Sequence, residues 1–165
     1  DPLWSRGLGD VYKRQRLVPG FDAPVVVSWG SRNRSAMVRV PRYKPSKPSS
    51  TRIAVRSVDS AANPYLAYAA MLGAGLKGIE EGLDLCAPVE ENLFKLSQAE
   101  IAERGLKYLP RDLSQAIDEF EKSELMHEIL GDVICENLIS AKRAEWEEYR
   151  AHVSSWEIDR YLARL

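Results

Sequence analysis

The stretch TRIAVRSVDSAANPYLAYAAMLGAGL, residues 51–76, constrains the fold of this chain more than any other. It opens with strict alternation of side-chain character, which is the pattern of a half-buried β-strand. Ile53 and Val55 are then expected on one face of a sheet. The opposite face would carry Arg52, Ala54 and Arg56. The strand therefore presents two arginines on a surface whose reverse side is apolar.

A helix is predicted to follow this strand after a short turn. Asn63 suits the N-cap position, and Pro64 suits the first helical position. No charged residue occurs between Tyr65 and Leu76, so we expect the helix to be buried on nearly all sides. An arginine-bearing strand face beside a buried helix is the arrangement of a binding site with a scaffold behind it.

The chain as a whole has the pattern of an α+β protein, with three or so antiparallel strands followed by a mostly helical C-terminal half. The strands are predicted at residues 25–29, 37–40 and 52–56, with an exposed loop rich in proline and serine at 41–50. Capping motifs predict helices that begin after Ser97, Asp112 and Ser154. Apolar residues recur at helical spacing between residues 123 and 150, which predicts an amphipathic helical stretch.

The first residues of the chain do not match this pattern. The segment DVYKRQ resembles the translated end of a sequencing adaptor, so residues 1–15 are expected to be a non-native leader. A chain of 165 residues supports one domain or a fragment of a larger one. We expect the true N-terminal part to be missing.

Cysteine usage and hydropathy bear on the location of the protein. Cys86 and Cys135 lie far apart without metal-ligand spacing, so free thiols in a reducing cytoplasm are expected. No signal peptide or membrane span is visible, so we expect no membrane partner.

Charge is distributed unevenly. Residues 1–56 hold twelve Lys and Arg against three Asp and Glu, whereas the remainder is acidic, and the net charge is −1. A basic half is compatible with nucleic acid, but most of these cations are arginines spaced along strand-like segments. Arginine is preferred over lysine for bidentate binding of phosphate and carboxylate. The pattern favours small anionic ligands and no nucleic-acid partner.

The arginines of this half form the main candidate site: Arg16, Arg32, Arg34, Arg39, Arg52 and Arg56. Their planar forks could surround a polyphosphate and a carboxylate together. From spacing alone, a solvated sheet face is the simpler interpretation, because surface arginines are common and contribute little. The paired glutamates, such as Glu90 and Glu91, are likewise interpreted as solvated positions. No nucleophile triad is visible.

Three motifs in order resemble a known family: RLVPGFDAP, SWGSRNRSAMVRVP, and the stretch from Thr51 through Ile79. They are similar to the C-terminal part of the catalytic domain of type I glutamine synthetase. The tail GDVICENLISAKRAEWEEYRAHVSSWEIDRYL resembles the Gram-positive-like branch. The resemblance covers residues 16–165 and implies a segment of the creatine-kinase-like β/α catalytic domain.

The resemblance implies ATP-dependent ligation of ammonia to the γ-carboxylate of glutamate, with Mg²⁺ or Mn²⁺, in a cytoplasmic homododecamer whose active sites lie between subunits. It assigns glutamate binding to Arg16, Arg34 and Arg56. It assigns ATP binding to Arg34, Arg39 and Arg52, and catalysis to Asp22 and Arg34. Phosphoryl transfer depends on such positioning and charge neutralisation more than on covalent chemistry.

Two departures from the family pattern matter. Asp22 stands where the family has a glutamate on the flap over the site, and Ala54 stands where it has a metal-ligating glutamate. Alanine binds no metal, so no metal ligand is expected in this chain at that position. The chain alone is expected to be inactive. Two alternatives stay open: a γ-glutamyl-amine ligase of the same fold, and a degenerate, non-catalytic subunit.

Overall fold

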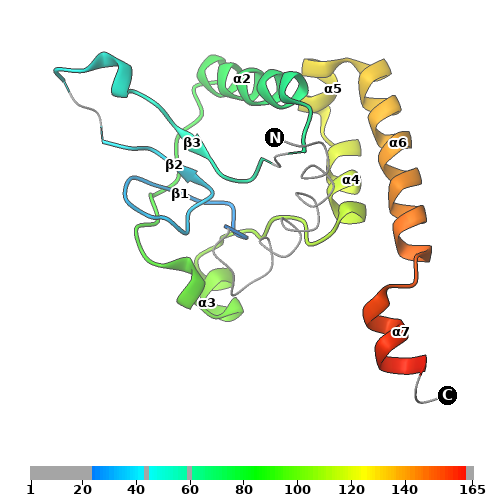
Figure 1. Ribbon diagram of the computed structural model, residues 1–165. Coiled ribbons are helices and arrows are strands. Elements are labelled where there is room, and N and C mark those ends of the chain that lie inside the picture. The colour runs from blue at the N-terminus through cyan, green and yellow to red at the C-terminus, as the bar shows by residue number, and fades with distance from the viewer. Residues whose placement is uncertain (1–23, 43–44, 59–60, 163–165) are drawn as a thin grey trace. The chain divides into compact units, whose positions relative to one another are not determined.

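The computed structural model describes residues 24–42, 45–58 and 61–162. The chain divides into two compact units, with the boundary between Arg111 and Asp112. The first unit carries a small sheet with helices around it, and the described part of the second is helical (Figure 1). The predicted α+β class, with a helical C-terminal half, is confirmed.

Three short strands form one sheet in the order β1–β2–β3. They are β1 (Trp29–Gly30), β2 (Val38–Arg39) and β3 (Ala54–Val55). β2 and β3 pair antiparallel as predicted, but β1 and β2 run parallel. The expectation of antiparallel pairing is therefore wrong for β1 and β2. The loop at 31–37 does not close as a hairpin, because its side chains bond to a distant segment and turn the chain back in its original direction.

The predicted strand at residues 25–29 is paired mainly outside this sheet. Val26 forms an isolated antiparallel bridge with Tyr108, and the Val27 N–H donates to the Lys107 carbonyl at 2.8 Å. Val26 is buried together with Leu93 and Ile101, and these residues form the core of the first unit. The segment 25–29 thus contributes Val26 to the core, and it enters the sheet only at its last residue, Trp29.

Helix α2 (Pro64–Glu80) begins where the sequence predicts. The Asn63 side chain accepts hydrogen bonds from the backbone N–H groups of Tyr65 and Leu66, at 2.9 and 3.4 Å. The prediction that the helix is buried is wrong: none of its described residues is buried, and Tyr65 is 84% exposed. Among the described residues of the first unit, β3 faces the helix across an open groove and does not pack directly against it.

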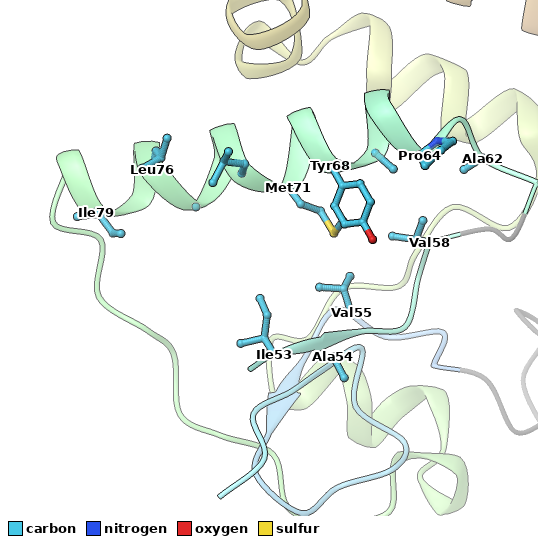
Figure 2. Close-up of a pocket in the computed structure, with 13 residues that line it drawn as sticks. Ile53, Ala54, Val55, Val58, Ala62, Pro64, Tyr68, Met71, Leu76 and Ile79 are labelled. Carbon is cyan, nitrogen blue, oxygen red and sulfur yellow. The ribbon is translucent and has the colours of Figure 1, made fainter. Parts of the chain in front are cut away.

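The groove between β3 and α2 has a volume of about 820 Å³ and an apolar lining. Ile53 and Val55 point into it toward α2, whereas Ala54 points to the other side of the strand (Figure 2). Tyr68 and Met71 face the strand from the helix. The alternation predicted for this strand is therefore confirmed at these three positions.

Short elements complete the first unit: η1 (Pro48–Ser50), η2 (Leu93–Lys95) and α3 (Gln98–Glu103). A capping box between Ser97 and Glu100 begins α3, as predicted. The chain leaves this helix through Gly105, whose φ of 67° favours glycine. The loop predicted at 41–50 contains η1, a single 3₁₀ turn that begins at a proline.

The second unit contains α4 (Leu113–Glu121), α5 (Glu124–Leu130), α6 (Asp132–Ala151) and α7 (Ser155–Tyr161). Asp112 and Ser154 cap α4 and α7 as predicted. The amphipathic stretch at 123–150 is divided at Gly131, which adopts a φ of 79° and separates α5 from α6. Arg143 of α6 bonds to both Asp118 and Glu121 of α4.

Among the described residues, no helix combines the length and the apolar character that crossing a membrane would require.

Candidate functional site: an arginine-bearing sheet face and its loop

One face of the sheet carries arginines from both β2 and β3. Arg39 and Ala54 are directly opposite each other in the antiparallel pair, so their side chains lie on the same face. The Arg56 N–H donates to the Met37 carbonyl at 2.9 Å, which continues the same register. Ala54 points away from the groove, so Arg39 and Arg56 belong to the face opposite α2 (Figure 2).

Arg39 has a buried donor on this face. Its side chain is half-buried, and its Nε atom has no hydrogen-bond partner within the described ranges. Leaving a buried donor unpaired costs about 1–3 kcal/mol, and more for charged groups. An oxygen of an anionic ligand would supply the missing acceptor. This buried donor is explained better by a phosphate or carboxylate ligand than by the interpretation of the face as a solvated surface.

The remaining predicted arginines are placed differently. Arg32 and Arg34 are exposed on the loop between β1 and β2, and Arg52 is exposed just before β3. Arg16 and Asp22 lie outside the described residues. The structure thus brings Arg39 and Arg56 together on one face, and it shows Arg34 on a loop that leads into β2.

Sequence reasoning missed the carboxylate that holds this loop. Glu90 accepts hydrogen bonds from the backbone N–H groups of Ser31 at 2.7 Å and Arg32 at 3.0 Å. The Ser31 and Arg32 N–H groups lower the pKa of Glu90 below its ordinary value, because they stabilise the charged form. Glu90 is exposed, as expected for a solvated position, but its carboxylate also bonds to the loop, which was not predicted. Only the excess of polar residues in SRNRS could have signalled that this loop needs partners.

Gly30 lies very close to the segment that contains Glu90. The Val89 N–H donates to the Trp29 carbonyl at 2.8 Å, which holds the two backbones side by side. A Cβ atom at position 30 would lie 2.6 Å from the Val89 carbonyl oxygen. The close approach requires glycine, because a backbone atom cannot move aside as a side chain can.

The described residues do not fit a metal ion on this face. Within residues 24–42, 45–58 and 61–162, no group of three or more His, Cys, Asp or Glu side chains could hold one. Ala54 offers no donor atom, and its cross-strand neighbour Arg39 is a cation. The side chains of Arg39 and Arg56 make this face cationic.

Comparisons with known proteins identify the family. The model of the glutamine synthetase catalytic domain matches residues 10–161, across both units. Glutamine synthetase of Mycolicibacterium smegmatis is 48% identical over 149 residues, which is 90% of this chain and 33% of the relative. That of Methanosarcina mazei is 46% identical over 151 residues, 92% of this chain and 33% of the relative. The chain spans about a third of the length of these curated relatives.

Solved structures agree. The ADP complex of GmaS superimposes with a TM-score of 0.71 at 32% identity, covering 86% of this chain and 30% of that one. Plasmodium falciparum glutamine synthetase has the same fold, with a TM-score of 0.68 at 22% identity over 90% of this chain and 36% of that one. By its sequence match over nearly its whole length, this chain belongs to the glutamine synthetase catalytic-domain family.

Proposed function

We propose that this chain is the C-terminal part of a glutamine synthetase, an enzyme that joins ammonia to the γ-carboxylate of glutamate at the expense of ATP. The observation that carries the proposal is the face with Arg39 and Arg56. On this face the buried Nε donor of Arg39 lacks an acceptor among the described residues, and an anionic ligand would supply one. The name shared by the curated relatives supports the reaction, and the ADP bound by GmaS supports a nucleotide ligand.

The resemblance to the family implies the roles of the individual arginines, and these roles suit the charges of the substrates. Arg16 and Arg56 would hold the carboxylates of glutamate, and Arg39 and Arg52 the phosphates of ATP. Arg34 would face the phosphoryl group as it moves to the γ-carboxylate, where a planar fork can neutralise the equatorial oxygens. Asp22 would accept a proton from ammonium, which leaves ammonia free to displace the phosphate.

The divalent metal that the family implies would bind through residues other than those described here. When bound, such an ion would supply positive charge that neutralises the phosphates. We extend the proposal to Mg²⁺ or Mn²⁺, to a cytoplasmic homododecamer with active sites between subunits, and to glutamate, ATP and ammonium as its small-molecule partners. The free thiols Cys86 and Cys135 support the cytoplasmic location.

A hybrid enzyme tests the function directly. In this hybrid, the chain replaces the matching third of the Mycolicibacterium smegmatis glutamine synthetase. We expect the hybrid to form glutamine from glutamate, ammonia and ATP, and the chain alone to form none, which is measured by coupled release of phosphate and by chromatography of glutamine. A hybrid that assembles like its parent but makes no glutamine would contradict the proposal.

The same assay addresses the two alternatives. Asp22, the proposed acceptor of the ammonium proton, belongs to this chain, so the hybrid would carry it. A hybrid that prefers polyamines to ammonia would favour a γ-glutamyl-amine ligase. A degenerate subunit is favoured by one observation, the alanine at position 54. An assembled hybrid that is inactive with every amine would support that alternative.

Restoring the missing carboxylate is expected to strengthen metal binding. Ala54→Glu in the hybrid enzyme should lower the Mg²⁺ concentration for half-maximal activity by about tenfold or more, because a carboxylate replaces a methyl group at the expected ligand position. Val55→Glu, on the opposite face of β3, is the matched control. If Ala54→Glu leaves the Mg²⁺ dependence unchanged, the lost ligand is immaterial.

A further inference from the structure

A segment far along the chain holds the loop that carries Arg32 and Arg34. Both oxygens of the Glu90 carboxylate are engaged, one by the Ser31 N–H at 2.7 Å and the other by the Arg32 N–H at 3.0 Å. Two bonds to consecutive backbone amides fix the orientation of that peptide, and the charge of the acceptor strengthens them. The carboxylate therefore acts on the backbone of the loop.

A second anchor is formed by Asn33 and Ser35, the two residues that flank Arg34. The Asn33 amide nitrogen donates to the Val89 carbonyl at 2.7 Å and to the Glu91 carbonyl at 2.6 Å. The Asn33 amide oxygen accepts from both the N–H and the hydroxyl of Ser35. The Ser35 hydroxyl in turn accepts from the Leu93 N–H at 2.9 Å. The Asn33 amide nitrogen and the Ser35 hydroxyl thus link the loop to the same segment, residues 89–93, and the bonds between Asn33 and Ser35 join these two links to each other.

The anchors leave the Arg34 side chain exposed between two buried neighbours. Asn33 and Ser35 are 6% and 3% exposed, whereas Arg34 between them is exposed. With its two neighbours fixed in the interior, the backbone of Arg34 has little freedom, although no hydrogen bond or ion pair to another described residue positions its side chain. Such pre-organisation matters most for a group that must meet charge as it develops in a transition state.

We propose that Glu90 is a positioning residue for phosphoryl transfer, because it fixes the loop that directs Arg34 at the transferring group. The proposal rests on the function proposed above and adds a residue to it. Glu90 touches no substrate in this scheme. It acts through the backbone of Ser31 and Arg32, while Asn33 holds the next turn of the loop.

The test is Glu90→Gln in the hybrid enzyme, with Glu91→Gln as the matched control. Both substitutions remove one negative charge, but the Glu91 carboxylate pairs with Arg104 at 2.9 Å and does not bond to the loop. We expect kcat to fall by about tenfold to a hundredfold in Glu90→Gln, with a KM for glutamate within about twofold of the parent. Glu91→Gln should keep both parameters, and Glu90→Asp should recover part of kcat because it retains two acceptor oxygens.

Amide hydrogen exchange of the 165-residue chain tests the anchor without any activity. The Ser31 and Arg32 amides should exchange about tenfold faster or more in Glu90→Gln and at the parental rate in Glu91→Gln. Unchanged exchange, an unchanged kcat, or equal losses in the two variants would overturn the role of Glu90. An inactive parent hybrid, by contrast, would overturn the proposed function and the catalytic role with it, whatever the exchange rates.

Discussion

Replacing Arg34 with alanine is expected to lower kcat of the hybrid enzyme by about a hundredfold to a thousandfold, the usual cost of removing one donor aimed at developing charge. The KM for glutamate should change much less, because Arg16 and Arg56 are proposed to hold its carboxylates. The kcat of Arg34→Lys should lie between those of the parent and Arg34→Ala, since lysine keeps the charge but lacks the planar fork. Steady-state kinetics with glutamate and ATP varied separately would measure both parameters.

Arg42→Ala is the control for this substitution. Arg42 is also an exposed arginine of the basic half, and it lies beyond β2, outside the proposed site. Its loss changes the net charge by the same amount, so it accounts for any general electrostatic effect on ATP. Equal activity in the parent and Arg34→Ala would remove Arg34 from the mechanism.

Asn33→Ala should produce the largest loss of stability, about 3 kcal/mol in the free energy of unfolding. The substitution leaves the Val89 carbonyl without its donor and the Ser35 N–H without its acceptor. The Glu91 carbonyl keeps only the longer bond from the Ser35 hydroxyl, at 3.4 Å. Each unsatisfied buried group costs about 1–3 kcal/mol, and partial relaxation of the loop keeps the total below the sum. Urea unfolding followed by circular dichroism would measure the loss.

Asn92→Ala provides the comparison. Its side chain accepts one hydrogen bond, from the Phe94 N–H at 3.0 Å, at an exposed position. Loss of such a cap is expected to cost about 0.5–1 kcal/mol. If the two asparagine variants were equally stable, the buried network around Asn33 would contribute nothing beyond an ordinary cap.

Local patterns predicted most of the fold in the second unit and much of it in the first. The caps at Asn63, Ser97, Asp112 and Ser154 are all present, because each depends on residues within three positions of one another. Burial of α2 was predicted incorrectly. A helix sequence without charges indicates that burial would be favourable, but it does not indicate which surface would bury the helix. The parallel pairing of β1 with β2 depends on contacts of the intervening loop with residues 89–93, which no local pattern encodes.

In the candidate site, too, local features were predictable from the sequence and contacts between distant segments were not. The shared face of Arg39 and Arg56 depends on alternation along the strand, which the sequence predicts, and on the register between β2 and β3, which the sequence does not predict. The role of Glu90 was not predictable, because its partners are backbone amides, which every residue has and no sequence pattern distinguishes. The roles of Arg16 and Asp22 stay predictions, since both lie outside the described residues.

The contact between Gly30 and Val89 has a consequence for the way these sequences can diverge. Position 30 meets a carbonyl oxygen at a distance that excludes any Cβ atom. A backbone atom offers no side chain that could shrink in compensation, so no substitution at position 89 can relieve the clash. Comparison of related sequences would record this contact as an unvarying glycine at position 30 without covariation. Methods that infer contacts from correlated substitutions would therefore miss this contact between the two segments.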